Sequence, residues 1–146
     1  MTPARFPLLD PARCVPCGLC EVACVETRTG LAGLLPDAPI VLEQRRLRIR
    51  DVAGIPSLEV CVHCADRPCV AVCPHNALVT FPNGRVELVE PRCTGCGHCI
   101  AACTFGAIRR ATTLNIAVKC DACAPVGGAP ACVPACPTGA LSLVVR

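Results

Sequence analysis

Sixteen cysteines in four groups of four constrain the fold more than any other feature of this 146-residue chain. The first and third groups have gaps of two, two and three residues, whereas the second opens its middle gap to four and the fourth to eight. Every group has three residues before its last cysteine, so its third and fourth cysteines would share one face of a short helix. The groups are Cys14, Cys17, Cys20 and Cys24; Cys61, Cys64, Cys69 and Cys73; Cys93, Cys96, Cys99 and Cys103; and Cys120, Cys123, Cys132 and Cys136.

So much cysteine first suggests a secreted domain held together by disulfides. The N-terminal stretch MTPARFPLLDPARC argues against secretion, because it has neither an apolar stretch nor a cleavage site of small residues. The chain also lacks an uninterrupted apolar run of about 18 residues, so we expect no membrane span. These features predict a cytoplasmic chain, in which reduced, clustered cysteines more often bind metal than form disulfides.

The cysteine spacing favours iron-sulfur clusters over zinc. Tetrahedral zinc usually takes two well-separated pairs of ligands, whereas three thiolates of one tight loop can bind three neighbouring irons of a cubane. Gly18, Gly95 and Gly97 would let the backbone N–H groups approach the sulfurs. Gaps of two, two and three followed by Pro are also typical of bacterial ferredoxins. We therefore predict four 4Fe-4S clusters, with one 3Fe-4S or empty site as the alternative.

These inorganic groups would fill a core that is short of large side chains, since the chain has three Phe and no Trp or Tyr. They would also change the charge, which is formally +3. Sixteen thiolates and four oxidised cores of about +2 each would contribute about −8 and leave about −5 overall. We therefore expect no nucleic-acid partner, and no basic stripe interleaved with aromatics suggests one.

The cysteine groups resemble a known family. The stretches CVHC, PCVAVCP, CTGCGHC, VKCDAC and PACVPACPTGAL are similar to those of the four-cluster polyferredoxin subunits of molybdenum and tungsten oxidoreductases, such as the electron-transfer subunit of dimethyl sulfoxide reductase. They also resemble smaller relatives that serve formate dehydrogenases, hydrogenases, carbon monoxide dehydrogenases and tungsten aldehyde oxidoreductases. The resemblance spans the chain from Cys14 to Leu141 and is specific for the cofactor and the role, but not for the partner.

The resemblance implies a crossed pairing of the groups, in which each set of three cysteines shares its cluster with the last cysteine of another group. Val25 and Thr104 follow a last cysteine where Pro is common in the family, which puts the local turn geometry in question. The four implied ligand sets are Cys14, Cys17, Cys20 and Cys136; Cys120, Cys123, Cys132 and Cys24; Cys61, Cys64, Cys69 and Cys103; and Cys93, Cys96, Cys99 and Cys73.

The implied fold is α+β, with two pseudo-symmetric bacterial-ferredoxin-like modules built from short helices and small antiparallel hairpins around four iron-sulfur clusters. One module would take residues 1–24 and 104–146, and the other residues 61–103. Residues 25–60 would form an inserted strand and loop segment.

Two segments between the groups predict strands. In VLEQRRLRIRDV, Leu47 and Ile49 alternate with arginines at 46, 48 and 50, which favours a half-buried edge strand protected by charge over a docking face for an acidic partner. ALVTFPNGRVELVE predicts a hairpin that turns at residues 82–84.

Other polar residues near the cysteines receive weaker predictions. We expect His63 and His98 to lie on the surface of the cluster loops rather than bind iron, and His75 to have no role beyond its turn. Lys119 either raises the potential of a neighbouring cluster by its charge or is an ordinary surface lysine. Asp66 and Asp121 are interpreted as turn formers.

The sequence has no nucleophile motif, no phosphate-binding loop and no free thiol once sixteen are assigned, so we expect a non-catalytic component. The predicted function is to relay electrons between a catalytic subunit and a second redox subunit or carrier, such as a flavoprotein or a soluble ferredoxin. The preferred catalytic partner is a tungsten or molybdenum aldehyde or formate oxidoreductase, with a nickel enzyme also considered. A freely diffusing or self-stacking polyferredoxin is the alternative.

Overall fold

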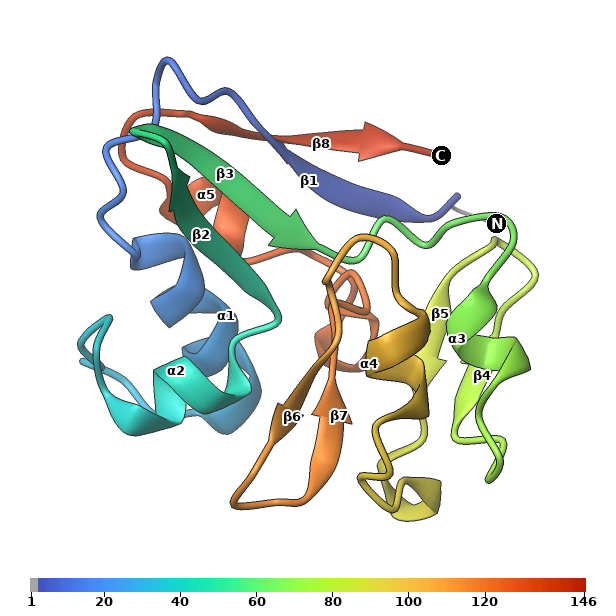
Figure 1. Ribbon diagram of the computed structural model, residues 1–146. Coiled ribbons are helices and arrows are strands. Elements are labelled where there is room, and N and C mark those ends of the chain that lie inside the picture. Colours follow the sequence, from blue (N-terminus) through green and yellow to red (C-terminus); the bar gives the residue numbers. More distant parts are fainter. Residues whose placement is uncertain (1–2) are drawn as a thin grey trace.

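A computed structural model describes residues 3–146 as a set of short helices and two-stranded antiparallel sheets (Figure 1). This arrangement confirms the predicted α+β class. In chain order the elements are β1 Arg5–Leu9, α1 Leu19–Thr29, α2 Pro39–Gln44, β2 Leu47–Val52, β3 Ile55–Val60, α3 Pro68–Ala71, β4 Leu78–Thr80, β5 Val86–Leu88, η1 Glu90–Arg92, α4 His98–Ala102, β6 Arg109–Ala111, β7 Ile116–Val118, η2 Ala124–Val126, α5 Cys132–Ala135 and β8 Leu141–Val145.

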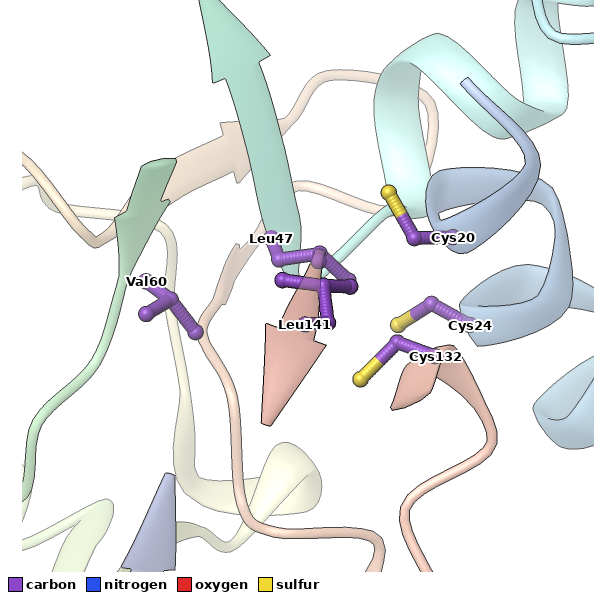
Figure 2. Packing of buried hydrophobic residues seen from close by; sticks show 6 residues of the cluster. All are labelled: Cys20, Cys24, Leu47, Val60, Cys132 and Leu141. Atoms are coloured by element: carbon purple, nitrogen blue, oxygen red, sulfur yellow. The ribbon is translucent and has the colours of Figure 1, made fainter. Parts of the chain in front are cut away.

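Strands from the two ends of the chain pair with each other. β1 and β8 lie side by side, with Leu9 opposite Leu141 and Arg5 opposite Val145 (Figure 1). Beneath them, α1 and α5 meet the β2–β3 hairpin in one apolar core (Figure 2). The buried members of this first core are Cys20, Cys24, Leu47, Val60, Cys132 and Leu141.

A second core lies in the middle of the chain, where α3 and α4 pack together and the β4–β5 and β6–β7 hairpins surround them (Figure 1). The predicted hairpin over residues 82–84 is confirmed, because β4 pairs with β5 on either side of that turn. Ile108 and Ala117 belong to the second core, although the sequence placed residues 104–146 in the other module. Its buried members are Cys69, Leu78, Val86, Cys99, Ile108 and Ala117.

The segment between the first two cysteine groups forms more helix than expected. VLEQ, residues 41–44, ends α2 and does not begin a strand. Pro39 favours a helix start at this point, because its fixed φ suits the first helical turn. Val41 is fully buried in a small apolar cluster with Val22 and Val25 of α1. Helix burial therefore overrides the strand pattern here.

The predicted strand begins at Leu47, and its arginines are paired with acidic groups. Arg48 and Arg50 both bond to Glu59 of β3, which lies directly opposite Arg48. Arg46 instead points toward the cysteine loops and donates to the carbonyl of Lys119 at 2.9 Å. The arginine row is therefore only partly the solvated edge that its alternation suggests. Over residues 3–146, no helix is long and apolar enough to cross a membrane.

Candidate iron-sulfur centres

One cavity brings together cysteines from opposite ends of the chain. Cys14, Cys17 and Cys20 line it from the first loop and the start of α1, and Cys136 lines it from the end of α5. Leu9 and Leu141, which face each other in the β1–β8 pair, close it with apolar surface. These four cysteines are one of the implied ligand sets.

A second cavity gathers another set of thiols, from the middle of the chain. Cys61, Cys64 and Cys69 line it from the loop before α3 and from α3 itself, and Cys103 lines it from the end of α4. Phe105 and Ile108 provide its apolar wall. This grouping matches a second implied set.

The other two sets are packed more closely among neighbouring helices. Cys24 and Cys132 lie side by side in the first core, and Figure 2 shows the sulfur of Cys20 directed away from both. Burial, together with repulsion from the nearby Cys24 and Cys123, raises the pKa of Cys132 to about 12. Cys20 and Cys24, one turn apart on α1, thus direct their sulfurs toward different groups of cysteines.

The remaining set, also from the middle of the chain, lies around α4. Burial raises the pKa of the Cys99 thiol, and repulsion from Cys93, Cys73 and Cys96 adds to that rise. The structure therefore gathers the thiols in the four groupings that the resemblance implies, whereas their ligation stays a prediction. Across residues 3–146, no three metal-binding side chains converge on the position of a single ion.

Backbone N–H groups point at the sulfurs, as the sequence predicts for loops that hold anionic thiolates. Their N to Sγ distances are 3.3 or 3.4 Å, and each donor lies two, four or more than twenty residues from its cysteine. The donor and acceptor pairs are Arg46 to Cys24, His63 to Cys61, Ala77 to Cys73, Ala107 to Cys103, Ala117 to Cys93, Ala122 to Cys120 and Ala140 to Cys136.

Three of these bonds arise from one repeated turn after a group's last cysteine. The third residue beyond the cysteine has a positive φ, and an alanine follows it whose N–H donates back to the sulfur. The turn residues are Asn76, Gly106 and Gly139, with φ of 49°, 60° and 64°. The repeated pair Asn-Ala or Gly-Ala is a sequence signal for this turn that our spacing argument missed.

The two departures from the family pattern have different outcomes. Thr104 keeps the turn, because Gly106 N–H donates to Cys103 O as Gly139 N–H does to Cys136 O. No such turn forms at Val25, because α1 continues past Cys24 to Thr29. The N–H of Arg46, the residue before β2, bonds to Cys24 Sγ in place of the missing turn.

Solvent exposure differs strongly among the cysteines. Cys17 and Cys96, the second members of the first and third groups, are exposed. Hydrogen bonds from the main chain and side chain of His98 lower the pKa of Cys96 to about 7. The buried members are Cys20, Cys24, Cys69, Cys99, Cys123 and Cys132.

Two polar residues lie deeper than the sequence suggests. His63 is 1 % exposed, so its expected place on the loop surface is wrong, and its Nδ1 accepts the N–H of Val86 at 3.1 Å. Burial lowers the pKa of His63 to about 3, which keeps the ring neutral. Lys119 is 0 % exposed, so it is not an ordinary surface lysine.

The structure confirms the surface position of His98 and the turn of Asp121. His75 and His98 are exposed. Asp121 forms the expected turn, because its Oδ1 accepts the N–H of Cys123 at 3.0 Å, and it also pairs with Arg28. Asp66 is exposed beside Cys64 and hydrogen-bonds to its thiol.

A sequence profile of the 4Fe-4S dicluster domain matches residues 52–146, about two thirds of the chain. The chain belongs to the 4Fe-4S dicluster family. The electron transport protein HydN of Escherichia coli strain K12 is 34% identical over 160 residues, which cover 97% of this chain and 89% of HydN. Formate hydrogenlyase subunit 2 of the same strain is 35% identical over 176 residues, covering 96% of this chain and 81% of that subunit. UacF, a longer protein with a provisional oxidoreductase name, is 38% identical over 143 residues, which are only 21% of its length.

Membership of the dicluster family makes this chain an iron-sulfur electron transport protein. Its sixteen cysteines fit four 4Fe-4S clusters, as the spacing predicted. The donor sets suit that cofactor, because thiols surround each site and backbone N–H groups offset their negative charge.

Proposed function

We propose that this chain is a non-catalytic relay subunit that binds four 4Fe-4S clusters in a row and transfers electrons between a catalytic oxidoreductase subunit and a second redox protein. The observation that carries this proposal is that Cys17 and Cys96, which belong to the first and last sets of the proposed row, are the exposed cysteines of residues 3–146. A bound 4Fe-4S cluster supplies one-electron redox chemistry, and the protein supplies its position and surroundings.

The proposed order follows from residues that adjoin two sets. Cys20 and Cys24 lie one turn apart on α1, so the set containing Cys14 borders the set containing Cys120. Burial raises the pKa of Cys120, and repulsion from Cys61 adds to it, which supports contact between the two modules at this point. Cys69 lies in α3 and Cys73 lies just beyond its end, so the set containing Cys61 borders the set containing Cys93.

The ends of this row suit exchange with partners. Cys17 belongs to the first set and Cys96 to the last, and both thiols are exposed. No cysteine of the two inner sets is exposed, although each outer set also contains one buried cysteine, Cys20 or Cys99. Electrons would therefore be exchanged with partners near Cys17 and Cys96, and would cross the module boundary between the inner sets.

The catalytic partner that we favour is a tungsten or molybdenum oxidoreductase acting on formate or an aldehyde, in the cytoplasm. A relative named as a formate hydrogenlyase subunit supports a partnership with a formate-converting complex. This chain matches only a fifth of the longer UacF, which supports the view that a module of this type works together with other protein domains. A flavoprotein or soluble ferredoxin would serve at the other end.

The test of partnership is anaerobic purification from the native source, with metal analysis of the fraction that contains this chain. We expect about sixteen irons and sixteen sulfides per chain, eluting with tungsten or molybdenum in a larger assembly. Nickel in that assembly would identify a different catalytic partner. Iron eluting with this chain alone, near 15.2 kDa, would support the free or self-stacking carrier instead.

The crossed pairing can be tested without assigning any spectrum beforehand. We expect Cys17→Ser and Cys136→Ser to alter the same electron paramagnetic resonance signal, because both residues line one cavity. Cys132→Ser is the matched control, since it removes a cysteine of the same group from a different set. If Cys136→Ser and Cys132→Ser alter one common signal, the crossed pairing is wrong.

A further inference from the structure

The only lysine of the chain is buried at the boundary between the two modules. Lys119 lies between β7 and Cys120, and its side chain is fully enclosed. Its Nζ donates to the carbonyl of Val86 on β5 at 2.5 Å and to the carbonyl of Cys120 at 2.6 Å. One ammonium group therefore joins a strand of the central module to a cysteine loop of the other.

Neither of these partners neutralises the charge. Both are backbone carbonyls, and no carboxylate of residues 3–146 lies within ion-pair distance of Nζ. Arg28 and Arg46 nearby differ in this respect, because both pair with Asp121. An isolated ammonium in the interior is costly unless an opposite charge compensates it.

The opposite charge available at this place is that of the cysteine sets. Nζ bonds to the carbonyl of Cys120, a member of one inner set, and to that of Val86, which packs in the second core with Cys69 of the other inner set. Cys69 and Cys120 belong to the two inner sets, so the ammonium acts on both.

We propose that Lys119 is the counter-ion shared by the two inner clusters and that it raises the reduction potential of both. This inference depends on the proposed function, because it takes the ligand sets of Cys61 and Cys120 as given. A fixed positive charge stabilises the more negative, reduced form of a nearby cluster, and net charge is one of the main determinants of cluster potential. Lys119 would thereby make the module boundary an easier place for an electron to reside.

The test compares the full chain, loaded with clusters, with its Lys119→Met and Lys119→Arg variants. Met has a similar length and no charge, whereas Arg keeps the charge. Redox titration followed by electron paramagnetic resonance measures all four midpoint potentials. For two clusters of Lys119→Met, we expect the ratio of reduced to oxidised protein at a fixed potential to fall at least tenfold, which is about 59 mV for a one-electron couple. The midpoint potentials of the other two clusters should change much less.

Arg50→Met is the matched control, because it removes a positive charge from a half-exposed position on β2. It should leave all four midpoint potentials near their original values. Lys119→Arg should restore most of the potential lost in Lys119→Met, which a purely structural role of the side chain would not explain.

Every outcome decides the inference. If Lys119→Met loads all four clusters with unchanged potentials, Lys119 is not their counter-ion. If Lys119→Met fails to load the inner clusters whereas Lys119→Arg loads them, the charge is required and the inference holds. If both variants fail to load, the site selects lysine by shape, and the counter-ion role is refuted. A wild-type chain with fewer than four clusters would instead overturn the proposed function itself.

Discussion

Leu9 lies opposite Leu141 in the antiparallel register of β1 and β8, and both residues line the cavity of Cys14 and Cys136. The pairing of the two chain ends thus determines where Cys136 lies relative to the first cysteine loop. Because Leu141 is 5 % exposed, its packing contributes directly to this core.

Truncating Leu141 should therefore loosen one cysteine set selectively. We expect Leu141→Ala to lower the free energy of opening of the β1–β8 pair by about 2 to 4 kcal/mol, because it deletes a buried side chain and leaves a cavity. Native-state hydrogen exchange of the cluster-loaded chain measures this value. Val145→Ala is the control, since Val145 is exposed on the same strand. Equal effects of the two variants would contradict the proposed role of Leu141.

Gly95 should tolerate alanine worse than other glycines with the same backbone conformation. Gly95 and Gly33 have φ of 70° and 74°, so alanine costs about 1 to 2 kcal/mol at either position. At Gly95 an added Cβ would also collide with Asn115, whereas at Gly33 it would meet nothing within 4 Å. We expect Gly95→Ala to bind less iron than Gly33→Ala and to melt at a lower temperature. Equal iron content and equal melting temperatures in the two variants would mean that the turn between β6 and β7 shifts at little energetic cost to accommodate the added Cβ.

Local features of this fold could be predicted well from the sequence. The hairpin around residues 82–84 forms where Asn83 provides its turn, and Asn83 Oδ1 accepts the N–H of Arg85. The spacing of Cys99 and Cys103 correctly indicated a short helix, because four residues span about one helical turn. Such signals depend on neighbours in sequence and therefore need no knowledge of the tertiary fold.

Features that depend on the packing of distant segments could not be predicted. Lys119 and His63 are buried because both bond to the main chain of Val86, one at its carbonyl and one at its N–H. No pattern within either cysteine loop indicates that β5 lies against it. For the same reason the sequence did not indicate that Ile108 packs with Cys69 and Cys99, since only the tertiary structure brings these residues together.

Substitutions at Arg28 and Asp121, which form a buried ion pair, should have strongly non-additive effects on stability. Their side chains are 13% and 6% exposed, and Arg46 adds a second contact to Asp121 at 3.5 Å. We expect Asp121→Asn to cost about 3 to 5 kcal/mol, because it leaves the buried guanidinium of Arg28 without a carboxylate and leaves Arg46 with Glu90 alone. Arg28→Met combined with Asp121→Asn should cost less than the sum of the single changes, as measured by native-state hydrogen exchange. Additive effects would show that the pair contributes little.

Glu43 should make the contact between α2 and the β6–β7 turn dependent on pH. Its carboxylate accepts hydrogen bonds from the hydroxyls of Thr112 and Thr113 and from the Thr113 N–H, and the bonds from Thr113 lower the pKa of Glu43 below 4.5. Because the folded pKa is the lower one, this stabilisation is complete above about pH 4.5 and is lost as the pH falls through the folded pKa. Protection of the Thr113 amide from exchange should decrease over that window.

In Glu43→Gln, the same amide should be less protected and its protection should not depend on pH in that window. The Gly30 amide is an internal control, because it donates to the main-chain carbonyl of Glu26. Its protection should be equal in both proteins. A pH-dependent decrease that persists in Glu43→Gln would assign the effect to another group.

Removing iron should unfold most of the chain, because cysteines occupy positions that apolar side chains fill in other proteins. Cys20, Cys24 and Cys132 form half of the buried first core, and Cys69 and Cys99 belong to the second. Without the clusters these thiols would repel one another when ionised and would surround unfilled space, so binding of the cofactor and folding should be coupled. We expect an iron chelator, with reductant present to prevent disulfides, to abolish the amide protection of β1, β8 and α4.

Chelator already saturated with iron is the matched control, and it should leave this protection intact. Returning iron and sulfide to the stripped chain should restore both the protection and the spectrum of the clusters. A stripped chain that still melts cooperatively would mean that Leu47, Leu78 and the other apolar residues build these cores without the clusters. The distinction matters for the relay, because a row of sites formed only with its cofactors would hold the spacing of the clusters constant in every folded molecule.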